Sequence, residues 1–276
     1  MIRDRANRNL RIALSRFLLI SLLAGSCTAP RHPVDSHAPD SADSVVELRG
    51  RVARYWSAKA TEDWSTVYGF LTPAVQASKS REEFVEWSQA NEPFRILSHE
   101  VVDVQTEKER GWAFIRYASQ LPRFPDAAPR ATQTWQKWVR IDGAWYPVPP
   151  TELEIHPNAP AMRDAGEELR LKTRIHFAFE ARQNKDWHAL YLLSDPRDHD
   201  RYSEESFIRA ESLVEYLSCR IDWAEVIGNR GRARVGYEHR LADPNLTKLP
   251  LQTLHVIEPW TLHEGEWYRD LDNSVH

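Results

Sequence analysis

The chain has 276 residues, a formal net charge of −4, 42% hydrophobic residues and two cysteines. Domains commonly have about 100–200 residues, so this length predicts one large or two small domains. The aromatic content of 11% argues against a disordered chain, and two cysteines exclude a disulfide-dense scaffold. The mildly acidic balance argues against nucleic-acid binding driven by charge.

The N-terminus has the pattern of an export signal. Five arginines precede a short apolar run, residues 17–24, and the small residues Gly25 and Ser26 follow it. The run is too short to span a bilayer, which needs about 20 apolar residues. An ordinary secretory signal that is cut nearby and a buried N-terminal helix are the two alternatives.

Cys27 follows these small residues directly, and the segment from Leu23 to Cys27 resembles the lipobox of bacterial lipoproteins. The segment departs from that motif at Ala24, where the lipobox prefers leucine. The resemblance implies that residues 1–26 are a lipoprotein signal peptide and that the Cys27 thiol receives a diacylglycerol. The protein would then be exported and lipid-anchored to a bacterial membrane, on its periplasmic or cell-surface side.

Removal of residues 1–26 changes the charge. This segment contains five arginines and one aspartate, so the mature chain has a net charge of −8. Residues 27–44 are rich in proline, serine, aspartate and histidine, which predicts a flexible tether. We interpret His32 and His37 in this tether as solvated side chains rather than metal ligands.

The rest of the chain is an internal repeat. With a shift of 123 residues, Asp63-Trp64 falls on Asp186-Trp187, and Ser80 falls on Ser203. With shifts of 120 and 122 the strand-like segments also match, including the closing pair Trp145-Tyr146 and Trp267-Tyr268. The repeat predicts two similar domains, residues 45–149 and 165–271, which a proline-rich linker of residues 150–164 joins.

Each copy has the same predicted elements. Apolar residues at helical spacing predict a first amphipathic helix. Asp63 can cap a second short helix, and Ser80 with Glu83 forms a capping box for a third. Asp142-Gly143 predicts a tight hairpin. The predicted strands are 95–106, 112–120, 132–141 and 144–148 in the first copy, and near 217–227, 232–240, 251–262 and 266–270 in the second.

Three helices followed by an antiparallel meander are an α+β pattern. Each copy resembles the NTF2-like (SnoaL-like) superfamily, through the helix that ends at Asp-Trp, the Ser-x-Glu-x-Phe helix and the closing Trp-x-x-x-x-Gly-x-Trp-Tyr hairpin. The resemblance implies two NTF2-like cone domains, each with about three N-terminal helices packed on a curved antiparallel sheet. Members of the superfamily include isomerases, dehydratases, cyclases and non-enzymatic modules, so the fold leaves the chemistry open.

The polar residues that the copies share have structural roles, mainly as helix caps, and the copies share no histidine. His176 is a possible pocket base in the second copy, but an exposed helical histidine is the simpler interpretation. Asp195, Asp198, His199 and Asp200 could hold a cation, although we favour a solvated polar loop. Cys219 is interpreted as a small buried residue. No phosphate loop, serine elbow or zinc motif is found, and we expect no metal, cofactor or catalytic residue.

Aromatic residues carry the binding hypotheses. Five of them are candidates to line a ligand pocket in the first copy, although core packing is the better account of most of them: Trp56, Tyr68, Tyr117, Trp135 and Trp138. In the strand around residue 115, the face that carries Trp112 and Phe114 is more apolar than a solvated sheet face. It could dock on the second copy, contact another protein, or be covered by the loop at 123–130.

Two functions remain open. In the first, the protein is a membrane-anchored, non-enzymatic binding or assembly module for a protein partner or a small apolar ligand. In the second, one copy is an isomerase or hydratase with an acid–base pocket. An open cone with His or Asp at its floor would favour the enzyme, and cones filled by side chains would leave protein binding.

Overall fold

The computed structural model describes residues 41–242 and 250–272. The predicted signal peptide, the lipidation site Cys27 and most of the predicted tether lie outside these residues. None of the described helices is both long enough and apolar enough to cross a membrane. The described chain is mixed helix and antiparallel sheet, as predicted.

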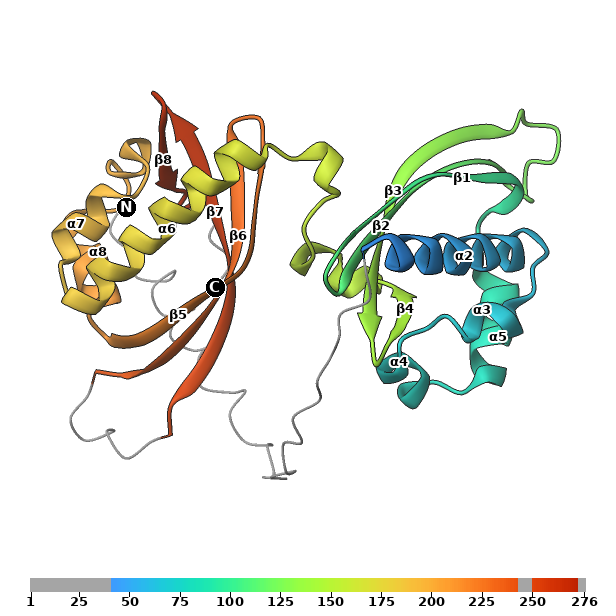
Figure 1. The fold of residues 1–276 in the computed structure, drawn as a ribbon, viewed down its shortest axis with the longest axis horizontal. Coiled ribbons are helices and arrows are strands. Elements are labelled where there is room, and N and C mark those ends of the chain that lie inside the picture. Colours follow the sequence, from blue (N-terminus) through green and yellow to red (C-terminus); the bar gives the residue numbers. More distant parts are fainter. Residues whose placement is uncertain (1–40, 243–249, 273–276) are drawn as a thin grey trace, which may run out of the picture. The chain divides into compact units, whose positions relative to one another are not determined.

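The first half, residues 41–149, has helices followed by a four-stranded antiparallel sheet of order β1-β2-β3-β4 (Figure 1). Its sheet curls around the long helix α2. The elements are α2 Ser41–Ala60, α3 Trp64–Tyr68, α4 Pro73–Ser78, α5 Arg81–Asn91, β1 Arg95–Glu107, β2 Arg110–Gln120, β3 Arg130–Ile141 and β4 Ala144–Pro147.

The second half, residues 165–272, repeats this order with a sheet of order β5-β6-β7-β8. In place of α4 it has the short 3-10 helix η3. The elements are α6 Ala165–Asn184, α7 Trp187–Leu192, η3 Pro196–Asp198, α8 Glu204–Glu211, β5 Val214–Ile227, β6 Arg230–Leu241, β7 Gln252–His263 and β8 Glu266–Arg269.

The two sheets are irregular at equivalent places. The pairing of β1 with β2 shifts register between Ile96 and Ser98 and again between Val101 and Asp103. The pairing of β5 with β6 shifts between Tyr216 and Ser218 and between Ile221 and Trp223, each 120 positions later. Such bulges bend a strand and increase its twist. The same two bends therefore curve both sheets.

Local chemistry sets the element boundaries as the sequence predicts. The Asp63 carboxylate accepts a hydrogen bond from Thr66 N at 3.0 Å and begins α3. Ser80 and Glu83 form the complete capping box of α5. At the β3–β4 turn Asp142 and Gly143 both have positive φ, 48° and 82°, which glycine adopts at little cost.

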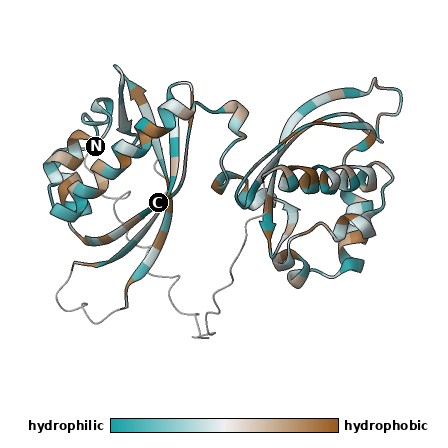
Figure 2. Cartoon of the chain, viewed as in Figure 1, coloured by the Kyte–Doolittle hydropathy of each residue, from teal (hydrophilic) through white to brown (hydrophobic). Residues whose placement is uncertain are grey.

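A glycine lets the long helix approach the sheet in each half. A Cβ at Gly111 would collide with Leu48 of α2, and one at Gly231 would lie 2.8 Å from Leu171 of α6. The apolar side chains of α2 pack against the sheet where the glycine allows the helix to come close. Figure 2 shows hydrophobic and hydrophilic residues alternating along that helix. The first core contains Leu48, Val52, Trp56, Phe70, Ile96, Val104, Ala113, Ile115, Trp138 and Trp145.

Three details differ from the prediction. Helix α2 begins at Ser41, so the last residues assigned to the tether are helical. Helix α4 was not predicted; it begins at Pro73, and proline is well suited to the first turn of a helix. The linker forms two 3-10 helices, η1 Pro150–Ile155 and η2 Pro160–Met162.

The linker is held by side chains of both sheets. The Trp112 indole donates to the Pro157 carbonyl at 2.9 Å, and the Trp223 indole donates to the Ile155 carbonyl at 3.0 Å. Lys137 donates to the His156 carbonyl at 2.8 Å. Trp112 is therefore buried under the linker, which is not one of the three explanations that the sequence suggested for this apolar face.

Candidate functional site

The predicted pocket aromatics do not form one lining. Trp56, Tyr117 and Trp138 share the inner face of the first half, where the rings of Trp56 and Tyr117 lie 4.9 Å apart. Trp135 lies on the other face of the sheet and packs on Phe114 at 5.2 Å. Tyr68 lies among the short helices, where its hydroxyl donates to the Lys79 carbonyl at 2.9 Å.

The interior of the first half is filled by its own side chains. Trp138 and Trp145 have no exposed surface, and Trp56 is 7% exposed. The Trp56 indole donates to Gln136 Oε1 at 2.9 Å, which satisfies the polar group that reaches into this core. These aromatics are packed core residues, and they leave the apolar-ligand hypothesis without room here.

The interior of the second half contains a charged network instead. Arg182 of α6 contacts Glu258 of β7 at 3.3 Å and Glu211 of α8 at 3.5 Å. Arg269 of β8 contacts Glu211 at 3.4 Å. The Tyr237 hydroxyl accepts from Arg182 at 2.5 Å and donates to Glu258 Oε1 at 2.7 Å. The network therefore joins α6, α8, β7 and β8 across the interior of the second half through paired, opposite charges.

Burial and pairing compete in setting the pKa values of this network. Burial opposes ionisation of Glu258, but Arg182 and Arg269 outweigh it and hold the pKa of that carboxyl below its ordinary value. Glu211 has a lowered pKa through the same balance. Burial raises the pKa of Tyr216 to about 12. At neutral pH the two carboxylates are therefore charged, and Tyr216 keeps its proton.

One atom of this network has no partner. Glu258 Oε2 is buried and accepts no hydrogen bond from any described residue. A charged carboxylate oxygen with a free lone pair beside a tyrosine hydroxyl can accept a proton or a donor group. This is the strongest candidate for acid–base chemistry within the described residues.

The sequence analysis missed this network because its residues come from separate elements and only the second copy carries them. The equivalents of Arg182, Glu211 and Glu258 are Lys59, Ser88 and Gln136. A signal was present in the strand pattern. Glu258 occupies an inward position of β7, between Val256 and Trp260, where alternation predicts an apolar residue.

The other candidates have structural surroundings. His176 is exposed on α6, as expected for a helical histidine. Cys219 is half-buried with a free thiol, and burial raises its pKa to about 11, so it is a poor nucleophile at neutral pH.

The loop with Asp195 and Asp198 is not the solvated loop that we expected. Both side chains are buried, with exposures of 3% and 7%. Asp195 pairs with Arg197 at 2.5 Å, and Asp198 accepts from Leu271 N at 2.9 Å, which fixes the loop to the chain beyond β8. His199 stacks on Tyr191 at 4.2 Å. Within the described residues, no group of three or more His, Cys, Asp or Glu side chains is arranged to hold a metal.

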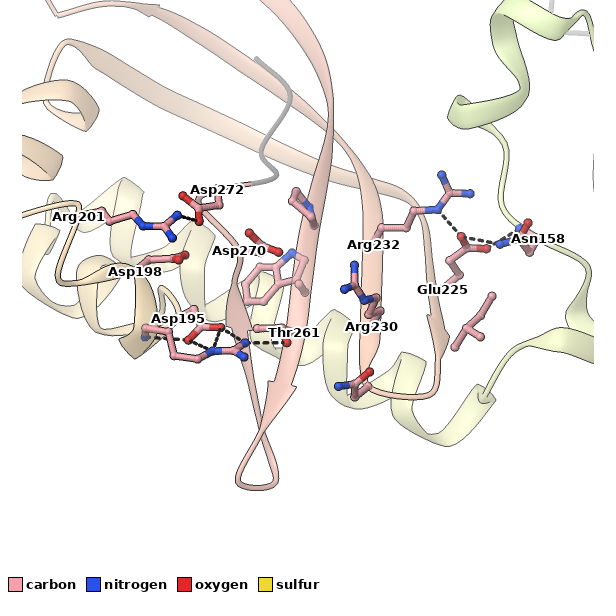
Figure 3. Close-up of a pocket in the computed structure, with 16 residues that line it drawn as sticks. Asn158, Asp195, Asp198, Arg201, Glu225, Arg230, Arg232, Thr261, Asp270 and Asp272 are labelled. Carbon is pink, nitrogen blue, oxygen red and sulfur yellow. Dashed lines mark hydrogen bonds and ion pairs between the residues drawn. The ribbon is translucent and has the colours of Figure 1, made fainter. Parts of the chain in front are cut away.

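This loop forms one wall of a cleft in the second half (Figure 3). The cleft has a volume of about 660 Å³ and is lined mainly by charged side chains. Its other wall comes from the β5–β6 turn and β7, with Asn158 of the linker. Its lining includes Asp195, Arg197, Asp198, Arg201, Glu225, Arg230, Arg232, Trp260, Thr261, Asp270 and Asp272.

No protein-family model and no curated protein matches this chain. Two solved structures are similar in part. A SEC-C motif containing protein from Rhodopseudomonas palustris is 20% identical over 33% of this chain and 68% of its own, with a TM-score of 0.29. An NTF2-like protein involved in plasmid conjugation is 9% identical over 79% of this chain and 94% of its own, with a TM-score of 0.25.

Proposed function

We propose that the mature protein is an exported, membrane-anchored binding or assembly module, built from two NTF2-like units, whose ligand is a protein partner. The observation that carries this proposal is the filling of both interiors. Fully enclosed tryptophans occupy the first, and an ion-paired network occupies the second. Among the described residues, these side chains leave neither interior with an open apolar cavity of the kind that small-molecule sites require.

Exposed aromatic residues give such a module a contact surface. Phe94 and Phe124 are 46% and 61% exposed. Phe94 immediately precedes β1, whose first residue pairs with the last residue of β2, and Phe124 lies in the loop after β2. Grouped exposed apolar side chains are typical of protein-binding surfaces. Trp112 is buried and cannot serve in this way, whereas the half-buried Phe114 remains a candidate contact.

A cross-linking pull-down of the anchored protein tests this function. We expect a stoichiometric protein partner that is captured by the wild type and lost in a Phe94→Ser, Phe124→Ser double variant. Phe177→Ser, at a 53% exposed position on α6, is the matched control and should keep the partner. Capture that is identical in all three proteins would contradict the proposed surface.

The anchor has its own test. Cys27→Ser should abolish acyl labelling and release the protein from membranes, because the thiol that carries the lipid is gone. Unchanged membrane association would contradict the lipoprotein assignment without bearing on the partner.

The unpartnered Glu258 Oε2 favours a second candidate, an isomerase- or hydratase-type enzyme in the second half. In it Glu258 would accept a proton and Tyr237 would position or donate one. Glu258→Gln tests this candidate, because the amide keeps the shape but loses the base. An activity that Glu258→Gln abolishes and Gln136→Ala leaves intact would establish the enzyme.

A further inference from the structure

The charges that line the cleft of the second half are mostly paired with one another. Arg197 pairs with Asp195, Arg201 with Asp272, and Arg232 with Glu225. Figure 3 shows the Arg201–Asp272 and Arg232–Glu225 pairs on the two sides of the cleft, with Arg230 on β6 near Arg232. These pairs neutralise one another, so the unpaired groups decide which ligand charge the cleft prefers.

Asp198 is a largely buried carboxylate that forms no ion pair within the described residues; the nearby Arg197 is paired with Asp195. Asp198 is 7% exposed and lines the cleft. Its Oδ2 accepts from Leu271 N at 2.9 Å. In Figure 3 its carboxylate is directed toward the side of the cleft where Asp270 lies.

The surroundings of Asp198 oppose its charge. Burial raises the pKa of this carboxyl, and the nearby Asp272, Asp195 and Asp270 raise it further, against the hydrogen bond from Leu271. A buried charge without a partner destabilises a fold unless something compensates it. A ligand cation at this position would provide the missing compensation.

Arg230, for which no ion pair is found among the described residues, is in a different situation. Arg230 is exposed at the start of β6, where water solvates its guanidinium. An exposed charge gains little from a ligand, because it exchanges one solvent contact for another. The buried Asp198, not Arg230, therefore sets the charge preference of the cleft.

We propose that this cleft binds a cationic group, a primary ammonium or a guanidinium, against Asp198. A volume of about 660 Å³ holds an extended amine or a basic side chain with its neighbours. The group comes either from a free polyamine or from a lysine or arginine of a protein. If the group belongs to a protein, the inference extends the proposed function and rests on it. If the group belongs to a free polyamine, the inference is independent of that function.

Calorimetric titration of the full mature chain tests the proposal. The probes are spermidine, a short lysine- and arginine-containing peptide, and a glutamate-containing peptide of the same length. We expect the two cationic probes to bind and the acidic peptide not to bind. Tighter binding of the peptide than of spermidine identifies a protein source, and the reverse order identifies a polyamine. No binding of either cation, or preferred binding of the acidic peptide, would overturn the proposal.

Asp198→Asn is the diagnostic variant. Its side-chain oxygen can still accept from Leu271 N, but the charge is gone, so we expect cation affinity to fall at least tenfold. Asp126→Asn, in the β2–β3 loop, is the matched control and should bind as the wild type does. Equal affinity in Asp198→Asn and the wild type would show that the cation does not use this carboxylate.

Two further measurements separate a ligand role from a structural one. Arg230→Gln removes a like but solvated charge from the lining, so cation affinity should stay the same or rise slightly, and a lowered affinity would contradict the assignment. Asp198→Asn should also raise the Tm of the ligand-free protein, because it removes an uncompensated buried charge. A lowered Tm with unchanged cation binding would make Asp198 a purely structural residue. Failure of these tests would not contradict the proposed function, which the pull-down with the Phe94 and Phe124 variants tests separately.

Discussion

Lys59 and Arg182 occupy equivalent positions on α2 and α6, yet they lie in different environments. Lys59 is half-buried at the surface, where it pairs with Glu92 at 3.6 Å. Arg182 has a side chain that is 3% exposed and contacts Glu211 and Glu258 in the interior. One backbone plan thus accommodates an aromatic core in the first half and a buried ionic network in the second.

The difference teaches how a repeated fold tolerates buried charge. Within the network of Arg182, Glu211, Glu258 and Arg269, each buried charge has an opposite one beside it, and only Glu258 Oε2 lacks a hydrogen-bond partner. A buried ion pair adds little stability compared with apolar packing, because desolvation offsets its Coulomb attraction. Removal of only one partner of a buried ion pair, however, strongly destabilises the fold, because the other charge stays buried without compensation. The comparison therefore predicts very unequal responses to equivalent substitutions.

The largest expected effect follows removal of the central cation. Arg182→Met should destabilise the second half by about 3–5 kcal/mol, because Glu211 and Glu258 lose a buried partner. The matched control is Lys59→Met, which removes a partly solvated pair and should cost at most about 1 kcal/mol. Urea unfolding followed by tryptophan fluorescence measures both. Equal costs would mean that the network is not energetically distinct from the surface pair.

The next effect should be similar in the two halves. A methyl group at Gly111 or Gly231 would overlap the long helix, so each Gly→Ala change should cost about 1–3 kcal/mol. Gly111 should be the more sensitive, because its added Cβ would lie nearer to the helix side chain. Gly50→Ala, on α2 with open space around it, should be neutral or stabilising. A neutral Gly231→Ala would show that α6 is not held against its sheet as α2 is.

The sequence predicted these shared features well, because they depend on local chemistry. Helix caps such as Asp63 and Ser80, and the turn at Gly143, are determined by a few neighbouring residues. The strand ranges follow from alternation. Sequence reasoning failed where several distant segments meet. Arg182, Glu211, Glu258 and Arg269 come from four elements, and no local pattern shows that their charges compensate one another.

Acidification should destabilise the second half more than the first. The folded-state pKa values of Glu211 and Glu258 are lowered, so their contribution to stability is present above their ordinary values. It is lost as the pH falls through the lowered folded-state values. The first half has Ser88 and Gln136 at these positions and lacks this dependence. We expect near-ultraviolet circular dichroism to show the second half unfolding first on acidification. Simultaneous loss of both halves would count against the network as the cause.

The smallest effect concerns the equivalent helix starts of α5 and α8. The Ser80 hydroxyl accepts from Glu83 N at 3.2 Å, and the Glu83 carboxylate accepts from Ser80 N at 2.9 Å. The Ser203 hydroxyl accepts from Ser206 N at 3.3 Å, but the Ser206 side chain accepts no hydrogen bond from Ser203 N. Ser80→Ala should cost about 1 kcal/mol and Ser203→Ala about 0.5 kcal/mol in urea unfolding.

The difference between the two helix starts can also be tested by a substitution that should increase stability. Ser206→Glu gives α8 the residue that completes the box in α5, and it adds an acidic side chain near the positive end of the helix. It should stabilise the second half slightly, and only while Ser203 is present, because the box needs both side chains. An equal gain in the Ser203→Ala background would assign the effect to the helix dipole, and the two helix starts would then differ in charge rather than in capping.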